Sequence, residues 1–206
     1  MLISKILKNQ AIWNLSQIVL GANEEKMKLY SSVIDNRGKI LDFGCANGNT
    51  FEAFKDYDYT GVDIDSNSID FANNKYKNYA NARFICADVT KNSLEKESFD
   101  NILFAGTGHH IDNKLLFKIT KSLSRLLKNG GSLYFIDTIR DKKRKSKLLS
   151  LLISLDQGKF HRTEYIYNHV LDKFSPDLKP IYHRTYKMKG TFVPQPTYYI
   201  AKLIKK

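Results

Sequence analysis

One stretch decides the fold of this chain: Lys39-Ile-Leu-Asp-Phe-Gly-Cys-Ala-Asn-Gly-Asn-Thr50. It begins with a short apolar run, Ile40-Leu41, which indicates a buried strand. Small residues follow at positions 44, 46 and 48, and we expect a helix to begin near Asn49 or Thr50, because both are good capping residues. Glycine has no Cβ and tolerates positive φ, so such a turn lets backbone approach a ligand closely. Open α/β sheets bind ligands at this carboxyl end of a strand.

The spacing of the small residues separates two classes of nucleotide cofactor. Dinucleotide-binding turns follow Gly-x-Gly-x-x-Gly, with the last two glycines three apart. Here Gly44, Ala46 and Gly48 follow Asp42 in an acid-x-Gly-x-Ala-x-Gly pattern. This pattern resembles motif I of the class I S-adenosylmethionine-dependent methyltransferases, with Ala46 in place of the middle glycine. The alternative is an ordinary tight turn between a strand and a helix.

Composition limits the classes of protein to which the chain can belong. Its 206 residues suffice for one α/β domain with a full core. Cys45 and Cys86 are the only cysteines and lack metal-ligand spacing, so we expect neither a disulfide framework nor a metal site. We interpret both as reduced packing residues of a cytoplasmic protein. The apolar N-terminal run stops at Asn9, so we expect neither a signal peptide nor a membrane span.

The chain is strongly basic, with 33 Lys and Arg against 21 Asp and Glu and a net charge of +12. This excess favours anionic partners such as nucleic acid, an acidic membrane or a phosphorylated substrate. A lysine-rich surface that only maintains solubility explains it equally well. The basic run at residues 140–147 has the same two interpretations, contact with phosphates or a solvated loop.

Strands and helices alternate along most of the chain. The predicted strands are 39–43, 59–63, 82–87, 98–105, 132–136, 181–188 and 197–204. The predicted helices lie within 2–34, from the cap Asp65 to about 77, and at 112–128, 145–156 and 163–173. This order argues for a parallel sheet with right-handed crossovers.

Acidic residues stand where the second and third strands end. Asp63 lies about twenty residues beyond the glycine turn, where a carboxylate accepts hydrogen bonds from ribose hydroxyls in either cofactor class. Asp88 follows the third strand. At this position the class I methyltransferases, which the chain resembles in motif I, have an acid that binds the adenine amino group. A capping aspartate in a turn is the alternative for Asp88.

The resemblance covers residues 38–138 in the family's order and spacing, including Ser98-Phe-Asp-Asn-Ile-Leu-Phe-Ala105 and the leucine-rich helix before Gly130-Gly131. It implies an α/β, Rossmann-like fold with a seven-stranded, mostly parallel sheet, helices on both faces and an N-terminal helical lid. One domain is expected over residues 1–206. Its parts are a lid (1–36), a cofactor-binding core (37–138), and substrate-cap helices with a C-terminal β-hairpin (139–206).

The resemblance also implies the cofactor, S-adenosyl-L-methionine. The cofactor-binding residues that it implies are Asp42, Gly44, Cys45, Ala46, Gly48, Asp63, Ile64, Asp88, Val89, Ala105 and Gly106.

Two histidines are candidates for a general base. Methyl transfer mainly requires alignment, but a hydroxyl acceptor must also lose a proton. His109 and His110 lie just past the strand 98–105, where substrate should enter, and we favour His110 slightly. The alternative for both is a structural role.

Four residues are candidates for substrate binding. Trp13 and Tyr30 belong to the predicted lid, although aromatic core anchors are an equal alternative. Asp156 and Arg162 lie around a glycine in a segment similar to one in a group of small bacterial methyltransferases without a firm substrate. Arg162 is expected to hold a carboxylate or phosphate, or else to pair with Asp156.

We therefore expect a methyltransferase that acts on a small-molecule or saccharide acceptor, at a hydroxyl. One alternative is methylation of RNA or anionic lipid, and another is a non-catalytic nucleoside-binding protein on the same scaffold. The fourth strand is not followed by the Asn/Asp-Pro-Pro-aromatic motif of amino-directed nucleic-acid methyltransferases, and no Pro-Cys nucleophile is present. The oligomeric state is not predicted.

Overall fold

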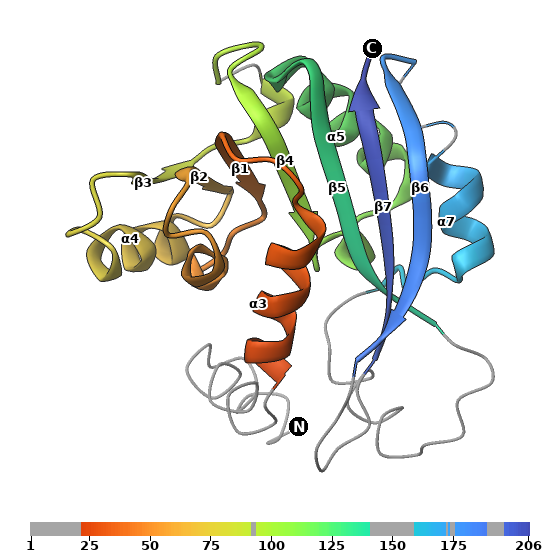
Figure 1. The fold of residues 1–206 in the computed structure, drawn as a ribbon, viewed down its shortest axis with the longest axis horizontal. Coiled ribbons are helices and arrows are strands. Elements are labelled where there is room, and N and C mark those ends of the chain that lie inside the picture. Colours follow the sequence, from red (N-terminus) through yellow and green to blue (C-terminus); the bar gives the residue numbers. More distant parts are fainter. Residues whose placement is uncertain (1–21, 92–93, 141–158, 172, 174–175, 189–195) are drawn as a thin grey trace.

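The structure, a computed structural model, describes residues 22–91, 94–140, 159–171, 173, 176–188 and 196–206. Within them one sheet has seven strands, in the order β3-β2-β1-β4-β5-β7-β6 (Figure 1). The strands are β1 (Lys39–Phe43), β2 (Asp58–Asp63), β3 (Ala82–Cys86), β4 (Phe99–Ala105), β5 (Leu127–Ile139), β6 (Leu178–Lys187) and β7 (Thr197–Lys205). The helices are α3 (Ala22–Val33), α4 (Ser66–Lys75), α5 (Asn113–Leu126) and α7 (Glu164–Leu171), with the 3₁₀ helices η1 (Asn49–Ala53), η2 (Val89–Lys91) and η3 (Gly108–His110).

The sheet is doubly wound and mostly parallel, which confirms the predicted fold class. Strands β1 to β5 pair in parallel, and β7 is antiparallel to both β5 and β6. From β1 the chain runs outward through β2 and β3, then returns to place β4 on the other side of β1. The helices that follow β1 and β4 therefore pack on opposite faces of the sheet, and such a switch point is where sheets of this kind bind ligands.

Helices cover both faces of the sheet because the strands bury apolar side chains on both sides (Figure 1). In β1, Ile40 packs in the cluster that includes residues of α3, η1 and α4. The next residue, Leu41, packs in the opposite cluster, with α5 and α7. Of the predicted N-terminal lid only α3 and the residues after it are described, and the predicted helix 145–156 lies outside the described residues.

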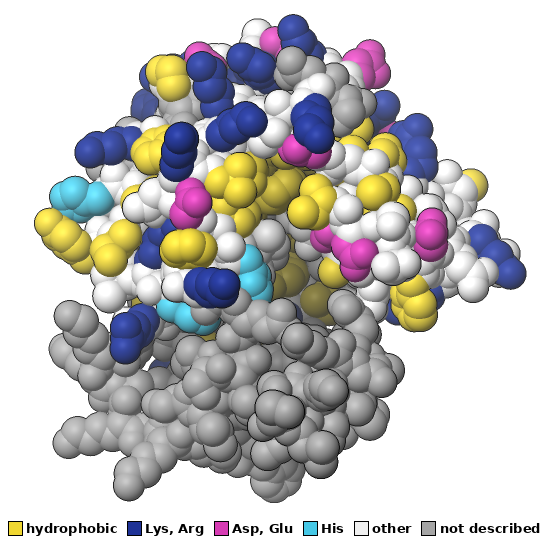
Figure 2. Space-filling view, turned by 180° about the vertical axis from the view of Figure 1, so that it is seen from behind, with side chains coloured by type: hydrophobic (Ala, Val, Ile, Leu, Met, Phe, Trp, Pro, Cys, Tyr) yellow, Lys and Arg dark blue, Asp and Glu magenta, His cyan; other side chains and the backbone are white. Residues whose placement is uncertain are grey.

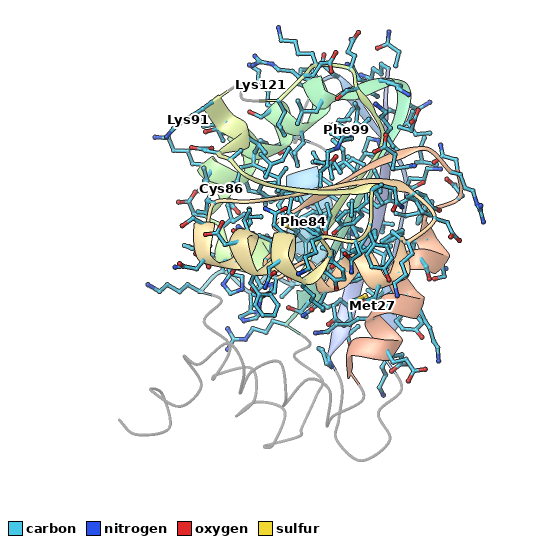
Figure 3. All side chains as sticks on the ribbon, turned by 90° about the vertical axis from the view of Figure 1, so that its left-hand side faces the viewer. Met27, Phe84, Cys86, Lys91, Phe99 and Lys121 are labelled. Atoms are coloured by element: carbon cyan, nitrogen blue, oxygen red, sulfur yellow. The ribbon has the colours of Figure 1, made fainter. Side chains whose placement is uncertain are left out.

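Aromatic rings fill the layer beneath the glycine turn. The Phe51 ring meets Tyr59 and Tyr76 edge-on, at centroid distances of 5.1 and 5.0 Å. Phe84 of β3 stacks on Tyr76 at 5.5 Å and lies inside this layer, while Cys86 lies at the end of the same strand (Figure 3). Such offset and edge-on pairs are the favoured aromatic geometries.

Two local predictions were wrong. The helix after the turn does begin at Asn49, as predicted, but it is a short 3₁₀ helix capped by Gly48, whose φ is 72°, and neither Asn49 nor Thr50 caps it. A side chain has no room at this cap, since a Cβ on Gly48 would lie 2.5 Å from the Phe84 ring. Strand β5 also begins earlier than the predicted residue 132, at Leu127, and includes Gly130 and Gly131. Asp65 does cap α4, and its side chain accepts a hydrogen bond from Asn67 N.

The packing around Gly61 yields a stability prediction. A Cβ on Gly61 would lie 2.7 Å from Phe84 Cδ1 and 2.8 Å from Cys45 Sγ, directly under the turn. Gly61→Ala should lower the free energy of unfolding by about 1–3 kcal/mol, because overpacking forces neighbouring groups to move. Urea unfolding measures the change.

Gly130→Ala is the matched control. Gly130 has a φ of +77° but no described atom within 4 Å of an added Cβ, so only backbone strain of about 1 kcal/mol is expected. A loss at Gly61 no larger than at Gly130 would contradict the packing described here.

Candidate active site

The glycine turn is fastened to the end of β2. Gly44 N and Cys45 N donate to Val62 O at 2.8 and 3.2 Å, and Ala46 N donates to Asp63 Oδ2 at 2.9 Å. Ala46 is left-handed, with a φ of 44°, which costs a residue with a Cβ about 1–2 kcal/mol. The hydrogen bond to the Asp63 carboxylate helps to hold it there.

The turns after β1 and β4 meet each other. A Cβ on Gly44 would lie 2.4 Å from Thr107 Oγ1, so only glycine allows this approach. Gly106 faces open space, because among the described residues a Cβ there would meet only Tyr30 Oη, at 3.8 Å.

Burial raises the pKa of Tyr30, and the charges of nearby Asp42 and Asp137 raise it further. Tyr30 is therefore a hydrogen-bond donor rather than a base.

Three predicted cofactor residues lie at the carboxyl ends of β2 and β3. Asp63 accepts from Ala46 N and from Asp65 N, at 2.9 and 3.0 Å, which leaves a carboxylate further lone pairs. Ile64 is an apolar side chain that is 76% exposed. Asp88 Oδ1 accepts from the hydroxyl and the N–H of Thr90, which lowers the pKa of Asp88, so its capping alternative is also present.

The motif acid, Asp42, lies beneath the turn instead of lining it. Its carboxyl is buried and accepts a 2.5 Å hydrogen bond from Tyr59 Oη. Burial raises the pKa of Asp42 to about 6, although hydrogen bonds from Tyr59 and Thr50 oppose the shift.

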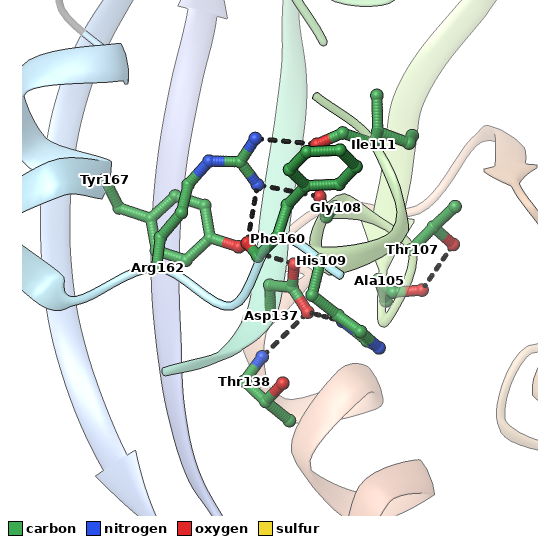
Figure 4. A network of polar contacts seen from close by, with 10 residues as sticks. All are labelled: Ala105, Thr107, Gly108, His109, Ile111, Asp137, Thr138, Phe160, Arg162 and Tyr167. Carbon is green, nitrogen blue, oxygen red and sulfur yellow. Dashed lines mark hydrogen bonds and ion pairs between the residues drawn. The ribbon is translucent and has the colours of Figure 1, made fainter. Parts of the chain in front are cut away.

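A buried polar network lies at the ends of β4 and β5 (Figure 4). His109 Nδ1 lies 2.5 Å from Asp137 Oδ1, and Tyr167 Oη donates to Asp137 Oδ2 at 2.6 Å. Thr138 N donates to the same carboxylate at 2.8 Å. His109 is buried and Asp137 is fully buried, whereas His110 is exposed. The His109 ring is 4.2 Å from His110 and stacks on His161 at 4.9 Å.

The predicted substrate residues do not come together in one place. Tyr30 lies near Gly106, while Trp13 and Asp156 lie outside the described residues. Arg162 is buried, and its N–H groups donate to the carbonyls of Gly108 and Ile111 and to other protein acceptors. This geometry favours a structural role for Arg162 over the expected grip on a substrate anion.

Sequence reasoning missed two residues of the network, Asp137 and Tyr167. The available signal was the position of Asp137, an acid within the apolar strand Leu133-Tyr-Phe-Ile-Asp-Thr-Ile139. A charge in such a strand needs buried partners. Tyr167 carries no comparable signal, because an aromatic on a helix usually packs in a core.

The molecular surface agrees with a site for an organic ligand. The face opposite to that of Figure 1 has a hollow lined by hydrophobic side chains, with histidine at its edge (Figure 2). The described residues contain no cluster of His, Cys, Asp and Glu able to hold a metal ion. No described helix has both the length and the apolar character needed to cross a bilayer.

Comparison with known proteins gives a family match over part of the chain. The family described as "Methyltransferase domain" matches residues 40–131, the segment from β1 into β5. No curated protein sequence matches the chain. A solved structure of a methyltransferase from Methanosarcina mazei, described as S-adenosylmethionine-dependent, is similar, with 20% identity and a TM-score of 0.67. That match covers 86% of this chain and 96% of the other.

Two further similar structures have named activities. N-methyltransferase NodS from Bradyrhizobium japonicum, solved with S-adenosylhomocysteine, has 16% identity and a TM-score of 0.69 over 98% of this chain and 95% of its own. Geranyl diphosphate C-methyltransferase from Streptomyces coelicolor, solved with Mg²⁺, geranyl diphosphate and S-adenosylhomocysteine, has 15% identity and a TM-score of 0.68. That match covers 89% of this chain and 77% of the other.

The doubly wound sheet, the turn at its switch point and the strand-end acids form an arrangement that is typical of nucleoside-binding α/β proteins. Over these same elements the chain matches the family described as "Methyltransferase domain". Its fold is that of the S-adenosylmethionine-dependent methyltransferase from Methanosarcina mazei.

The residues present fit S-adenosylmethionine, the cofactor that the sequence predicts. Gly106 leaves space beside its backbone, Gly44 allows the two turns to approach each other, and Asp63 retains acceptor capacity for ribose hydroxyls. The exposed Ile64 offers an apolar surface to a base, and Asp88 lies at the end of the next strand. Val89, Cys45 and Ala105 complete the predicted set, whose individual contacts with the cofactor remain predictions.

The buried motif acid predicts a pH-dependent stability. Because the pKa of Asp42 rises from 3.8 to about 6 on folding, the stabilising protonated form is fully present below about pH 4. This contribution is lost as the pH rises through 6. Relative to Asp42→Asn, the wild-type protein without cofactor should therefore lose up to about 3 kcal/mol between pH 4 and pH 7.5.

Urea unfolding of both proteins at the two pH values tests this expectation. Asp56→Asn, at an exposed position just before β2, is the control and should show no such difference. A constant gap between wild type and Asp42→Asn would contradict the buried placement of the carboxyl.

A second prediction concerns cofactor choice. Calorimetry should show binding of S-adenosylmethionine and S-adenosylhomocysteine but not NAD. Asp63→Ala should weaken S-adenosylhomocysteine binding by about 1.5–3 kcal/mol, because it removes a charged acceptor from the ribose hydroxyls. The exposed Asp70→Ala on α4 is the control and should bind normally. Tight NAD binding, or an unchanged Asp63→Ala, would refute this assignment.

Proposed function

We propose that the protein methylates a hydroxyl group of a small-molecule or saccharide acceptor, with His109 as the general base. The observation that carries this proposal is the buried pair of His109 and Asp137 at the carboxyl ends of β4 and β5. The sequence alone slightly favoured His110, but that residue is exposed, whereas His109 is buried beside Asp137.

The Asp137 carboxylate prepares His109 for this role. A neutral imidazole that donates from Nδ1 to Asp137 carries its lone pair on Nε2. Nε2 then accepts the proton of the acceptor hydroxyl, and Asp137 stabilises the resulting imidazolium. The same logic operates in other enzymes in which an aspartate fixes the tautomer of a basic histidine.

The remaining groups bind and align. Bound S-adenosylmethionine supplies a methyl group on a positively charged sulfur. The glycine turn, Asp63 and Asp88 would hold its nucleoside. Tyr30, whose hydroxyl points to the space over Gly106, would donate a hydrogen bond there.

The acceptor atom does not follow from the fold. The similar structures include an N-methyltransferase and a C-methyltransferase, so related scaffolds serve different acceptors. RNA or anionic lipid as acceptor is supported only by the net charge of +12. That alternative requires a steep fall of binding with salt, which acceptor-binding measurements at several salt concentrations would reveal.

Substitution of the two histidines tests the proposal. In single-turnover methyl transfer, His109→Gln should slow the reaction by roughly 10²–10⁴-fold, because it removes the base. His110→Gln, the matched control, should react nearly normally. The wild-type rate should rise with pH through a single apparent pKa, and this rise should vanish in His109→Gln.

Cofactor affinity and melting temperature are measured alongside the rate. Both should hardly change in His110→Gln, and S-adenosylhomocysteine should still bind His109→Gln. Full activity in folded His109→Gln would remove this residue from the mechanism and leave alignment as the source of catalysis.

A further inference from the structure

Arg162 is a buried cation that serves one short loop. Its side chain is only 5% exposed, and the segment that carries it, residues 159–163, crosses the end of β5. Nη2 donates to Ile111 O at 2.6 Å, and Nη1 donates to Gly108 O at 2.8 Å. Nε donates to Asn113 Oδ1 at 2.9 Å, at the start of α5. The fork of the guanidinium thus grips the loop on both sides of His109 (Figure 4).

The backbone of the same segment completes the grip. Phe160 N donates to His109 O at 2.8 Å, so the base is held through its own carbonyl. Arg162 pairs with Ile139 in a parallel bridge, and Arg140 N donates to Arg162 O at 2.9 Å. The segment is therefore fixed to the end of β5, two residues beyond Asp137.

Tyr167 connects the cation to the carboxylate. The Arg162 guanidinium lies 5.7 Å from the centre of the Tyr167 ring, and the hydroxyl of that ring donates to Asp137. The hydrogen-bond acceptors of Arg162 described here are neutral, namely three main-chain carbonyls and one amide oxygen. Because these acceptors are neutral oxygens of the protein, we interpret Arg162 as a residue that holds the backbone in position rather than one that binds a ligand.

We propose that Arg162 is a positioning residue that fixes the tautomer and reach of His109, and so joins the segment before α7 to the catalytic loop. This inference rests on the proposed role of His109 as the base. Arg162 acts on the catalytic pair in two ways. It holds the carbonyls of the loop that carries His109, which fixes the position of the imidazole. It also packs on Tyr167, which orients the carboxylate of Asp137. Small errors in such alignment slow catalysis by as much as about 10²-fold.

Arg162→Lys tests this role, because it keeps the charge but loses the planar fork. The first readout needs no cofactor: ¹⁵N NMR of histidine-labelled protein at pH 8 reports the tautomer of each ring. The His109 signal, assigned by its absence in His109→Gln, should show a proton on Nδ1 in the wild type. In Arg162→Lys it should become a mixture of the two tautomers.

The second readout is kinetic. Arg162→Lys should lower the single-turnover rate by about 10- to 100-fold while S-adenosylhomocysteine affinity stays within about twofold. Arg184→Lys is the matched control, since Arg184 is an exposed arginine over the Tyr182 ring on β6. It should change neither the tautomer nor the rate.

The outcomes separate this inference from the proposed function. A folded Arg162→Lys with the wild-type tautomer and rate overturns the inference. A slow Arg162→Lys beside a fully active His109→Gln overturns the proposed function instead. If Arg162→Lys does not fold, Asn113→Ala removes only the Nε acceptor and should give a smaller change of the same kind; no change in folded Asn113→Ala overturns the inference.

Discussion

The buried carboxylate of Asp137 imposes the constraint on which the centre of this molecule depends. A carboxylate removed from water must find hydrogen-bond donors, since an unpaired buried charge costs several kcal/mol. Asp137 takes its donors from the loop after β4, from α7 and from its own strand. These elements are far apart in sequence, so satisfying one group fixes them all. Gly108 belongs to the same constraint, because a Cβ there would lie 2.5 Å from Asp137 Oδ2.

The elements with a local signature were predictable from the sequence. Strand β1 and its turn are marked by an apolar run followed by small residues at alternate positions, and the structure has the strand at the predicted residues, Lys39–Phe43. Asp63 and Asp88 were placed because parallel strands bring their carboxyl ends to one edge of the sheet. The cap Asp65 follows from its side chain alone.

What the sequence did not reveal depends on contacts between distant residues. His109 and His110 look alike in the chain, and they differ only in the fold, which buries His109 beside a carboxylate 28 residues further on. Arg162 resembles a ligand-binding arginine until its carbonyl acceptors, about fifty residues away, are known. The left-handed Ala46 is similarly hidden, because it is held by a hydrogen bond to the next strand.

The place of β7 in the sheet has a consequence for how the chain folds during synthesis. Strand β6 is made first, but among the described strands it pairs only with β7, which separates it from β5. Until residues 197–205 leave the ribosome, β6 has no partner, and β5 remains an open apolar edge. Unpaired edges of this kind invite wrong pairing with other chains. The nascent protein therefore exposes this edge until β7 is made, although most of the parallel sheet can form before then.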